Sequence, residues 1–175
     1  MGLLRRREER REDDALQYQM REKMFSIGDD YWIENSRGER AFKVDGKALR
    51  IRETLVLETA GGEEVFTIQE KKLSVRDKME IERSGQTVAT VKKALVSPLR
   101  DRFSIDVEGG EDMEAKGNIV DHEYTVERGG NKVAEVSKKW FRVRDTYGIE
   151  IAPEQDDALI LAVTVCIDQM AHNVG

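Results

Sequence analysis

The side chains best suited to covalent catalysis are few in this sequence. It holds one cysteine, Cys166, and two histidines, His122 and His172. A Cys-His pair could supply a nucleophile and a base only if the thiol were accessible beside an imidazole. Cys166 stands instead between Val165 and Ile167. We therefore expect a buried, unreactive thiol and no catalytic residue.

Possible metal ligands occur together at two points, at residues 29–30 (Asp-Asp) and 121–123 (Asp-His-Glu). Neither has the ligand spacing of a zinc or calcium site, and both are typical of polar strand ends. A phosphate-binding loop would need a following helix and a Lys-Ser/Thr pair, which the three glycine pairs lack: Gly61-Gly62, Gly109-Gly110 and Gly129-Gly130. The sequence therefore predicts no metal and no cofactor.

A repeated dibasic step suggests a different chemistry, the binding of a phosphorylated headgroup. Pairs of lysines follow the second strand of three predicted hairpins, and four arginines lie nearby in sequence. Such side chains hold phosphate groups through charge-assisted hydrogen bonds. The alternative is that the lysines only solubilise strand ends among abundant Asp and Glu. The candidate headgroup-binding residues are Lys71, Lys72, Lys92, Lys93, Arg100, Arg102, Lys138, Lys139, Arg142 and Arg144.

The two tryptophans, Trp32 and Trp140, bear on the same question. Trp side chains pack in barrel walls and also anchor proteins at membrane interfaces. We expect wall packing, the commoner role, and keep membrane anchoring as the alternative.

Composition limits the classes of protein to consider. The 175 residues suit one domain, and a net charge of −6 argues against nucleic-acid binding by bulk charge. A single cysteine permits no internal disulfide, which favours a cytoplasmic location. Residues 1–17 carry five arginines and five acidic residues and no apolar segment typical of a secretory signal. They are predicted to form a charged arm or frayed helix before a domain at 18–175.

From Lys23 onward, short alternating runs separated by Gly, Asn, Asp or Ser are typical of consecutive β-hairpins. Five hairpins, an early segment at 23–27 and a late one at 148–151 give about twelve strands. Alternation with a period of two residues places every second side chain on one inner face. Aliphatic residues recur on that face at spacings of 24, 24, 24 and 21: Ile33, Leu57, Ile81, Ile105 and Val126.

The segment 158–167 is apolar on every side of a helical wheel, and we predict a helix at about 156–171. Such a helix must be surrounded by protein, and it is too short to span a membrane, which takes about 20 residues. A closed sheet of eleven or twelve strands has room for a helix. The sequence therefore predicts a mainly β fold, a closed antiparallel barrel enclosing a hydrophobic C-terminal helix. The alternative, a two-layer α+β fold, would wet one helix face and favour an amphipathic helix.

Three stretches precede this helix in order: 22–31 (EKMFSIGDDY), 42–47 (FKVDGK) and 136–141 (VSKKWF). With 145–151 and the helix, they resemble the LURP-one-related family over most of residues 18–172. The resemblance implies the fold of the Tubby C-terminal domain and of phospholipid scramblases, twelve strands around a hydrophobic helix. Tubby domains bind phosphoinositides through basic side chains and scramblases work at membranes, but a shared fold does not fix a function.

These observations favour a non-enzymatic binding or scaffold protein, with an anionic phospholipid headgroup or a membrane surface as the leading ligand. It would bind peripherally, since no transmembrane segment is predicted. One alternative is a protein-interaction module, which needs an exposed apolar patch. Another is an enzyme acting on a small phosphorylated ligand, which needs a pocket with perturbed acids.

Overall fold

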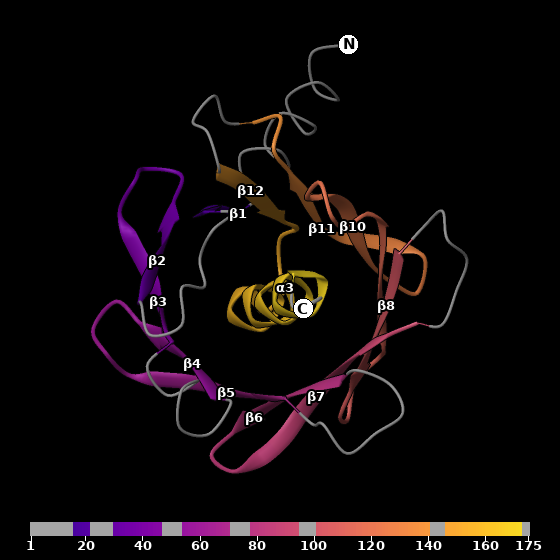
Figure 1. The fold of residues 1–175 in the computed structure, drawn as a ribbon, viewed down its shortest axis with the longest axis horizontal. Coiled ribbons are helices and arrows are strands. Elements are labelled where there is room, and N and C mark those ends of the chain that lie inside the picture. The colour runs from indigo at the N-terminus through magenta and orange to yellow at the C-terminus, as the bar shows by residue number, and fades with distance from the viewer. Residues whose placement is uncertain are drawn as a thin grey trace.

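The computed structural model describes residues 16–21, 30–46, 54–70, 78–94, 101–140 and 146–172. Twelve strands surround one helix, α3 (Asp157–His172), which runs through the middle of the barrel (Figure 1). The strands are β1 (Leu16–Arg21), β2 (Tyr31–Asn35), β3 (Arg40–Asp45), β4 (Thr54–Thr59), β5 (Glu64–Glu70), β6 (Lys78–Arg83), β7 (Gln86–Lys93), β8 (Asp101–Val107), β9 (Met113–Asn118), β10 (Glu123–Arg128), β11 (Asn131–Ser137) and β12 (Thr146–Ile151).

The sheet closes because its first and last strands pair. Each strand lies antiparallel to its chain neighbours, and β1 lies against β12 from Leu16 opposite Ile151 to Arg21 opposite Thr146. The predicted closed antiparallel barrel is confirmed. β1 already begins at Leu16, so it includes two residues that the sequence analysis placed in the arm. Residues 1–15 and the strand predicted at 23–27 lie outside the described residues.

The 24-residue spacing marks a real structural repeat. All five recurring aliphatic side chains are fully buried in the core. In four hairpins the register shifts directly after this residue, and the residue that follows is a glutamate: Glu34, Glu58, Glu82 and Glu127. Such bulges increase local twist and bend the strand, which helps a sheet to close.

Helix α3 is enclosed on all sides, as the apolar segment 158–167 predicted. Every residue from Ile160 to Met170 is buried. The helix begins where Asp156 accepts a hydrogen bond from the Leu159 amide, an N-cap contact of 3.1 Å. Three buried polar residues interrupt its apolar surface: Thr164, Asp168 and Gln169.

The two ends of the barrel differ. At the hairpin rim, five short turns connect consecutive strands, and α3 begins there beside Arg83, whose guanidinium lies 3.8 Å from Asp156. At the opposite end, which we call the loop rim, β7 and β11 end and β10 and β12 begin. The C-terminal part of α3 reaches this rim, because Asp168 contacts Tyr147 at the start of β12.

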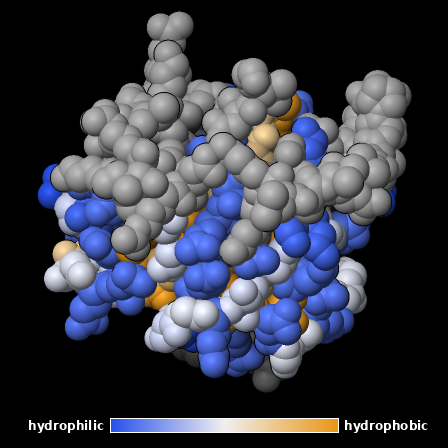
Figure 2. All heavy atoms as spheres, turned by 60° about the horizontal axis from the view of Figure 1, so that its bottom comes forward, coloured by the Kyte–Doolittle hydropathy of each residue, from blue (hydrophilic) through white to orange (hydrophobic). Residues whose placement is uncertain are grey.

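The outer wall is mostly hydrophilic. Figure 2 shows polar side chains over the face on which β6 and β7 lie in Figure 1. Many of its charges are paired across strands, with distances of 3.1 Å for Lys43 to Glu58 and 2.8 Å for Lys116 to Glu127. Part of the high charge content of the sequence therefore lies on the wall as pairs of opposite sign.

Candidate functional site

The topology brings two of the predicted dibasic steps to the loop rim. Lys92 and Lys93 end β7, and Lys138 and Lys139 directly follow β11. Both strands run in the same direction, so both end at the loop rim. Four strand positions separate the two ends along the sheet. That separation is roughly 19 Å along the wall, at about 4.8 Å per strand. Five further candidates lie outside the described residues: Lys71, Lys72, Arg100, Arg142 and Arg144.

Two of the described candidates already have an acidic partner. Lys92 Nζ lies 2.5 Å from an Asp106 carboxylate oxygen, and Arg102 lies 3.4 Å from Glu114. Exposed pairs of this kind contribute about 0–1 kcal/mol each, so a stronger anion could displace them. Lys92 and Arg102 thus belong to the paired outer wall. Lys138 and Lys139 lie in a turn beyond the end of β11.

This turn, residues 138–140, is held by Glu123, the first residue of β10. The carboxylate of Glu123 accepts hydrogen bonds from Ser137 Oγ at 2.8 Å and from the Lys138 amide at 3.0 Å. Ser137 Oγ in turn accepts a bond from the Lys139 amide at 3.1 Å. The backbone of the turn is therefore fixed, while the Lys139 side chain is exposed.

The expectation that both tryptophans pack in the wall is only half right. Trp32 lies half-buried in β2, with the Arg40 guanidinium 4.5 Å from its ring centroid, a cation–π contact. Trp140 lies beyond the end of β11 and is 41% exposed. Glu123 accepts hydrogen bonds from Ser137 and from the Lys138 amide, and β11 ends at Ser137. Trp140 therefore lies outside the sheet and does not pack in the wall.

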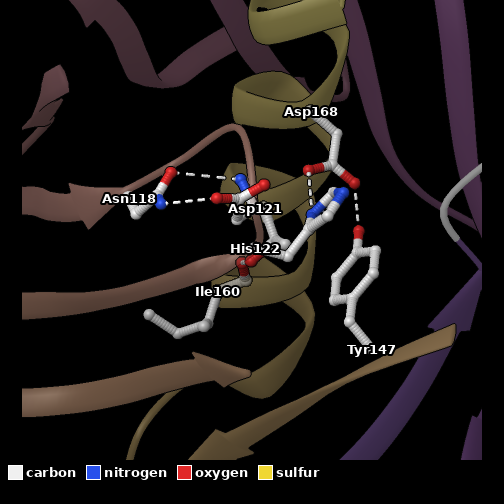
Figure 3. A network of polar contacts seen from close by, with 7 residues as sticks. Asn118, Asp121, His122, Tyr147, Ile160 and Asp168 are labelled. Carbon is white, nitrogen blue, oxygen red and sulfur yellow. Dashed lines mark hydrogen bonds and ion pairs between the residues drawn. The ribbon is translucent and has the colours of Figure 1, made fainter. Parts of the chain in front are cut away.

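A second turn, residues 119–122 between β9 and β10, exposes another apolar side chain at the same rim. Val120 is 57% exposed, whereas Ile119 and His122 on either side are fully buried. Asn118 fixes the turn, because its side chain donates to Asp121 Oδ2 at 2.7 Å and accepts from the Asp121 amide at 3.2 Å (Figure 3). Among the described residues, Val120 and Trp140 are the large hydrophobic side chains that stand exposed.

Beneath this turn lies a buried polar cluster that sequence reasoning missed. His122 Nδ1 lies 3.3 Å from Asp168 Oδ1, and the Tyr147 hydroxyl donates to Asp168 Oδ2 (Figure 3). The imidazole stacks on the Tyr147 ring with centroids 4.1 Å apart. His122 adopts a positive φ of 52°, which turns its side chain inward. Asp168 was the available signal in the sequence. Its carboxylate lies in an otherwise apolar helix that was predicted to be enclosed, and a buried charge requires hydrogen-bonding or charged partners.

The electrostatics of the cluster favour a structural role over acid-base catalysis. Burial and the negative charge of Asp168 raise the pKa of Tyr31, Tyr124 and Tyr147 well above the ordinary value of 10.0. These phenols therefore remain neutral, and that of Tyr147 donates to Asp168. Cys166 is fully buried, as predicted, and burial raises the pKa of its thiol.

The residues considered as metal ligands do not converge. His122 points into the core, Asp121 bonds Asn118 at the surface, and Glu123 holds Ser137 and Lys138. Within the described residues, no group of three or more His, Cys, Asp or Glu side chains could hold a metal ion.

Two hollows on the described surface carry the wrong charge for a phosphorylated ligand. One, of about 410 Å³, is lined by Asp30, Glu34 and Arg40, and Arg40 lies over Trp32. The other, of about 440 Å³, includes one arginine among several acids: Arg102, Asp106, Asp112, Glu114 and Glu127. Carboxylates in such numbers repel phosphate, so neither hollow supports an enzyme acting on a phosphorylated ligand.

No helix among the described residues is both long enough and apolar enough to cross a membrane.

Comparison with known proteins agrees with this fold. The chain is 30% identical over 154 residues to the uncharacterized protein YxjI of Bacillus subtilis (strain 168), covering 88% of this chain and 93% of that protein. The X-ray structure of an Arabidopsis thaliana protein superposes with a TM-score of 0.66 at 18% identity, covering 89% of this chain and 91% of the other. The family model described as LURP-one-related matches residues 16–168. This chain therefore belongs to the LURP-one-related family.

Proposed function

We propose that this protein is a non-enzymatic binding or scaffold protein that recognises anionic phospholipid headgroups at a membrane surface through its loop rim. The observation that carries the proposal is the meeting of two dibasic steps, Lys92-Lys93 and Lys138-Lys139, at one end of the barrel. The other basic candidates belong to the same proposal. Binding would be peripheral, from the cytoplasmic side.

A net charge of −6 does not by itself prevent such binding. Among the described residues of the wall, Glu58, Asp106, Glu114 and Glu127 each pair with a lysine or arginine of a neighbouring strand. Charges beyond about 8–10 Å are screened at physiological salt. A rim that approaches the membrane first is therefore governed by its local charges. Each lysine near an anionic bilayer contributes about 1 kcal/mol of attraction.

The family description and the name of the bacterial relative give no sign of catalytic activity. The acid-rich hollows also weigh against an enzyme acting on a phosphorylated ligand. A protein-interaction module is the stronger alternative, because Trp140 and Val120 are exposed at the loop rim.

The test is co-sedimentation with vesicles of phosphatidylcholine and phosphatidylserine, with and without phosphoinositides, at several salt concentrations. Converting Lys92, Lys93, Lys138 and Lys139 to Gln should weaken binding roughly a thousandfold at low salt, at about 1 kcal/mol per lysine. The two pairs changed separately should each cost roughly thirtyfold.

The matched control is the double change Arg37→Gln and Lys132→Gln. It removes the same charge as either pair but lies at the hairpin rim, where Arg37 is exposed in the turn between β2 and β3 and Lys132 is the second residue of β11. Binding should be retained in this control. Failure of the wild-type protein to bind anionic vesicles at low salt, or equal binding by the quadruple variant, would contradict the proposal and favour the interaction-module alternative.

A further inference from the structure

We propose that Trp140 and Val120 form an apolar tip that enters the interfacial layer of the bilayer while Lys138 and Lys139 contact lipid phosphates. This inference rests on the proposed function and specifies which side of the molecule meets the membrane and how deeply. We define the tip as residues 119–122 together with 138–140.

The two turns of the tip are one structural unit. Strand β10 lies between β9 and β11, so the turn before β10 and the turn after β11 are neighbours. Glu123 joins them, because it follows His122 in the chain and accepts hydrogen bonds from Ser137 and Lys138. The exposed side chains therefore belong to adjacent connections on one rim.

The tip is also preorganised. Val120 stands between two fully buried residues, Ile119 and His122. The side chain of His122 lies in the polar cluster (Figure 3). The bonds between Asn118 and Asp121 fix the turn from outside, and His122 is held by Tyr147 and Asp168 from inside. Exposure of Val120 is thus imposed by the fold, and insertion needs little ordering of the protein.

The strands meet closely at the base of the tip. Gly117 in β9 has a φ of 139°, and a Cβ there would lie 2.7 Å from the Glu123 carbonyl oxygen and 2.8 Å from Tyr124 Cα. Only glycine permits this approach of β9 to β10. The close contact places the 119–122 turn directly beside Glu123, which carries the second turn.

The size and chemistry of the tip fit a membrane better than a protein. A stable protein interface takes about 800 Å² from each partner, whereas a tryptophan buries about 150–250 Å². One half-exposed tryptophan and one valine therefore fall short of a protein interface. An indole with lysines beside it is suited to the headgroup layer, where its ring is apolar and its N–H remains hydrated.

Tryptophan fluorescence tests the inference directly, because the chain has two tryptophans. Trp32→Phe leaves Trp140 as the reporter, and Trp140→Phe leaves Trp32, which lies on the wall under Arg40. The probe is a vesicle of equal parts phosphatidylcholine and phosphatidylserine, with brominated acyl chains as quencher. We expect a blue shift and quenching in the Trp32→Phe protein and neither in the Trp140→Phe protein.

Two further variants measure the contribution of the tip to binding. Trp140→Ala should weaken vesicle binding about tenfold, as expected for partial burial of one aromatic ring. Val120→Glu should weaken it at least as much, and because Val120 is largely exposed the fold should be unchanged. Gln86→Glu, which adds the same charge at the exposed hairpin rim, is the matched control and should bind normally.

Each outcome separates the tip from the headgroup proposal. Binding by the Trp32→Phe protein without a change in Trp140 emission, together with normal binding by Trp140→Ala, would overturn the tip and leave the headgroup proposal standing. Quenching of Trp140 that persists when the four lysines are changed to Gln supports insertion of the apolar side chains and contradicts both the headgroup site and the phosphate contacts of Lys138 and Lys139. Absence of binding to any vesicle, with capture of an acidic protein through Trp140, would overturn both.

Discussion

Helix α3 carries the same pair of groups, a tyrosine hydroxyl on an aspartate, at each of its ends. At the hairpin rim Tyr18 donates to Asp157 Oδ2 at 2.5 Å, and at the loop rim Tyr147 donates to Asp168 Oδ2. The surroundings differ: Asp157 is only half-buried, whereas Asp168 is 3% exposed. The two ends therefore place one interaction in two electrostatic environments.

The helix itself accounts for much of this difference. A carboxylate in the first turn is stabilised by the positive end of the helix dipole, and one in the last turn is destabilised by the negative end. Asp157 thus requires little further stabilisation from side chains of the wall, whereas the buried carboxylate of Asp168 requires hydrogen-bond donors from other elements. Tyr147 and His122 surround it, and His122 in turn fixes the 119–122 turn. The contacts that compensate for the burial of Asp168 therefore also hold the 119–122 turn of the loop rim in place.

Placing a third carboxylate midway along α3 should have the largest effect. Leu161 is fully buried, and Leu161→Asp would leave a charge at the barrel axis without a tyrosine partner. We expect the free energy of unfolding to fall by at least about 3–5 kcal/mol, enough to unfold a typical domain. Urea denaturation followed by circular dichroism measures the loss.

The matched control is Leu159→Asp, on the same helix but half-buried and near its first turn. It should lower stability distinctly less than Leu161→Asp. Unchanged melting of the Leu161→Asp protein would contradict an enclosed central helix.

Removing one hydroxyl at each end compares the two pairs directly. Tyr147→Phe leaves the buried Asp168 with one donor fewer and should cost about 1–3 kcal/mol of unfolding free energy. Tyr18→Phe leaves Asp157 open to water and should cost less than about 1 kcal/mol. Chemical denaturation of both variants measures the difference. Equal losses would show that burial does not distinguish the two ends.

Alkaline pH should weaken the loop-rim end through its tyrosines. Burial and Asp168 raise the pKa of Tyr31, Tyr124 and Tyr147 above 10.0, so above pH 10 the unfolded chain loses phenolic protons that the folded chain retains. Stability from these groups is complete below pH 10 and is lost as pH rises towards the raised values. Each such tyrosine adds a slope of about 1.4 kcal/mol per pH unit.

Comparing variants isolates this slope from the titration of surface lysines. In Tyr147→Phe the unfolding free energy should fall less steeply above pH 10, because the contribution of one tyrosine to the slope, about 1.4 kcal/mol per pH unit, is removed. Denaturation curves between pH 8 and pH 11 test this, and a slope identical to that of the wild type would contradict a buried, neutral Tyr147.

The smallest expected effect is on the reactivity of Cys166. Cys166 is fully buried two residues before Asp168, and burial raises the pKa of its thiol, so the native protein should resist thiol reagents until it opens. Labelling should be faster in Tyr147→Phe than in Tyr18→Phe, since the first variant loosens the nearer end. Mass spectrometry of timed reactions follows the label, and rapid labelling of the wild type would reopen the catalytic-cysteine hypothesis.

Local patterns predicted most of the fold because each reflects local physics. Alternation with a period of two residues located the strands, and an all-round apolar segment required a closed shell. The sequence correctly predicted that the recurring aliphatic residues face the core. It did not predict the bulges that follow four of them, because the register of a strand depends on its partner strand. Trp140 was misplaced because a side-chain contact from β10 ends β11, and no local pattern records it.

Residue patterns were thus sufficient to predict which segments alternate, where they turn, and that the last helix is enclosed. They did not reveal that His122, Tyr147 and Asp168 come into contact. Nor did they reveal that Lys92-Lys93 and Lys138-Lys139 share a rim with Val120 and Trp140. The physical reason is sequence distance: alternation and apolarity act over a few neighbouring residues. Contacts across a barrel depend on closure, strand direction and the position of the helix along its axis, which are properties of the whole chain.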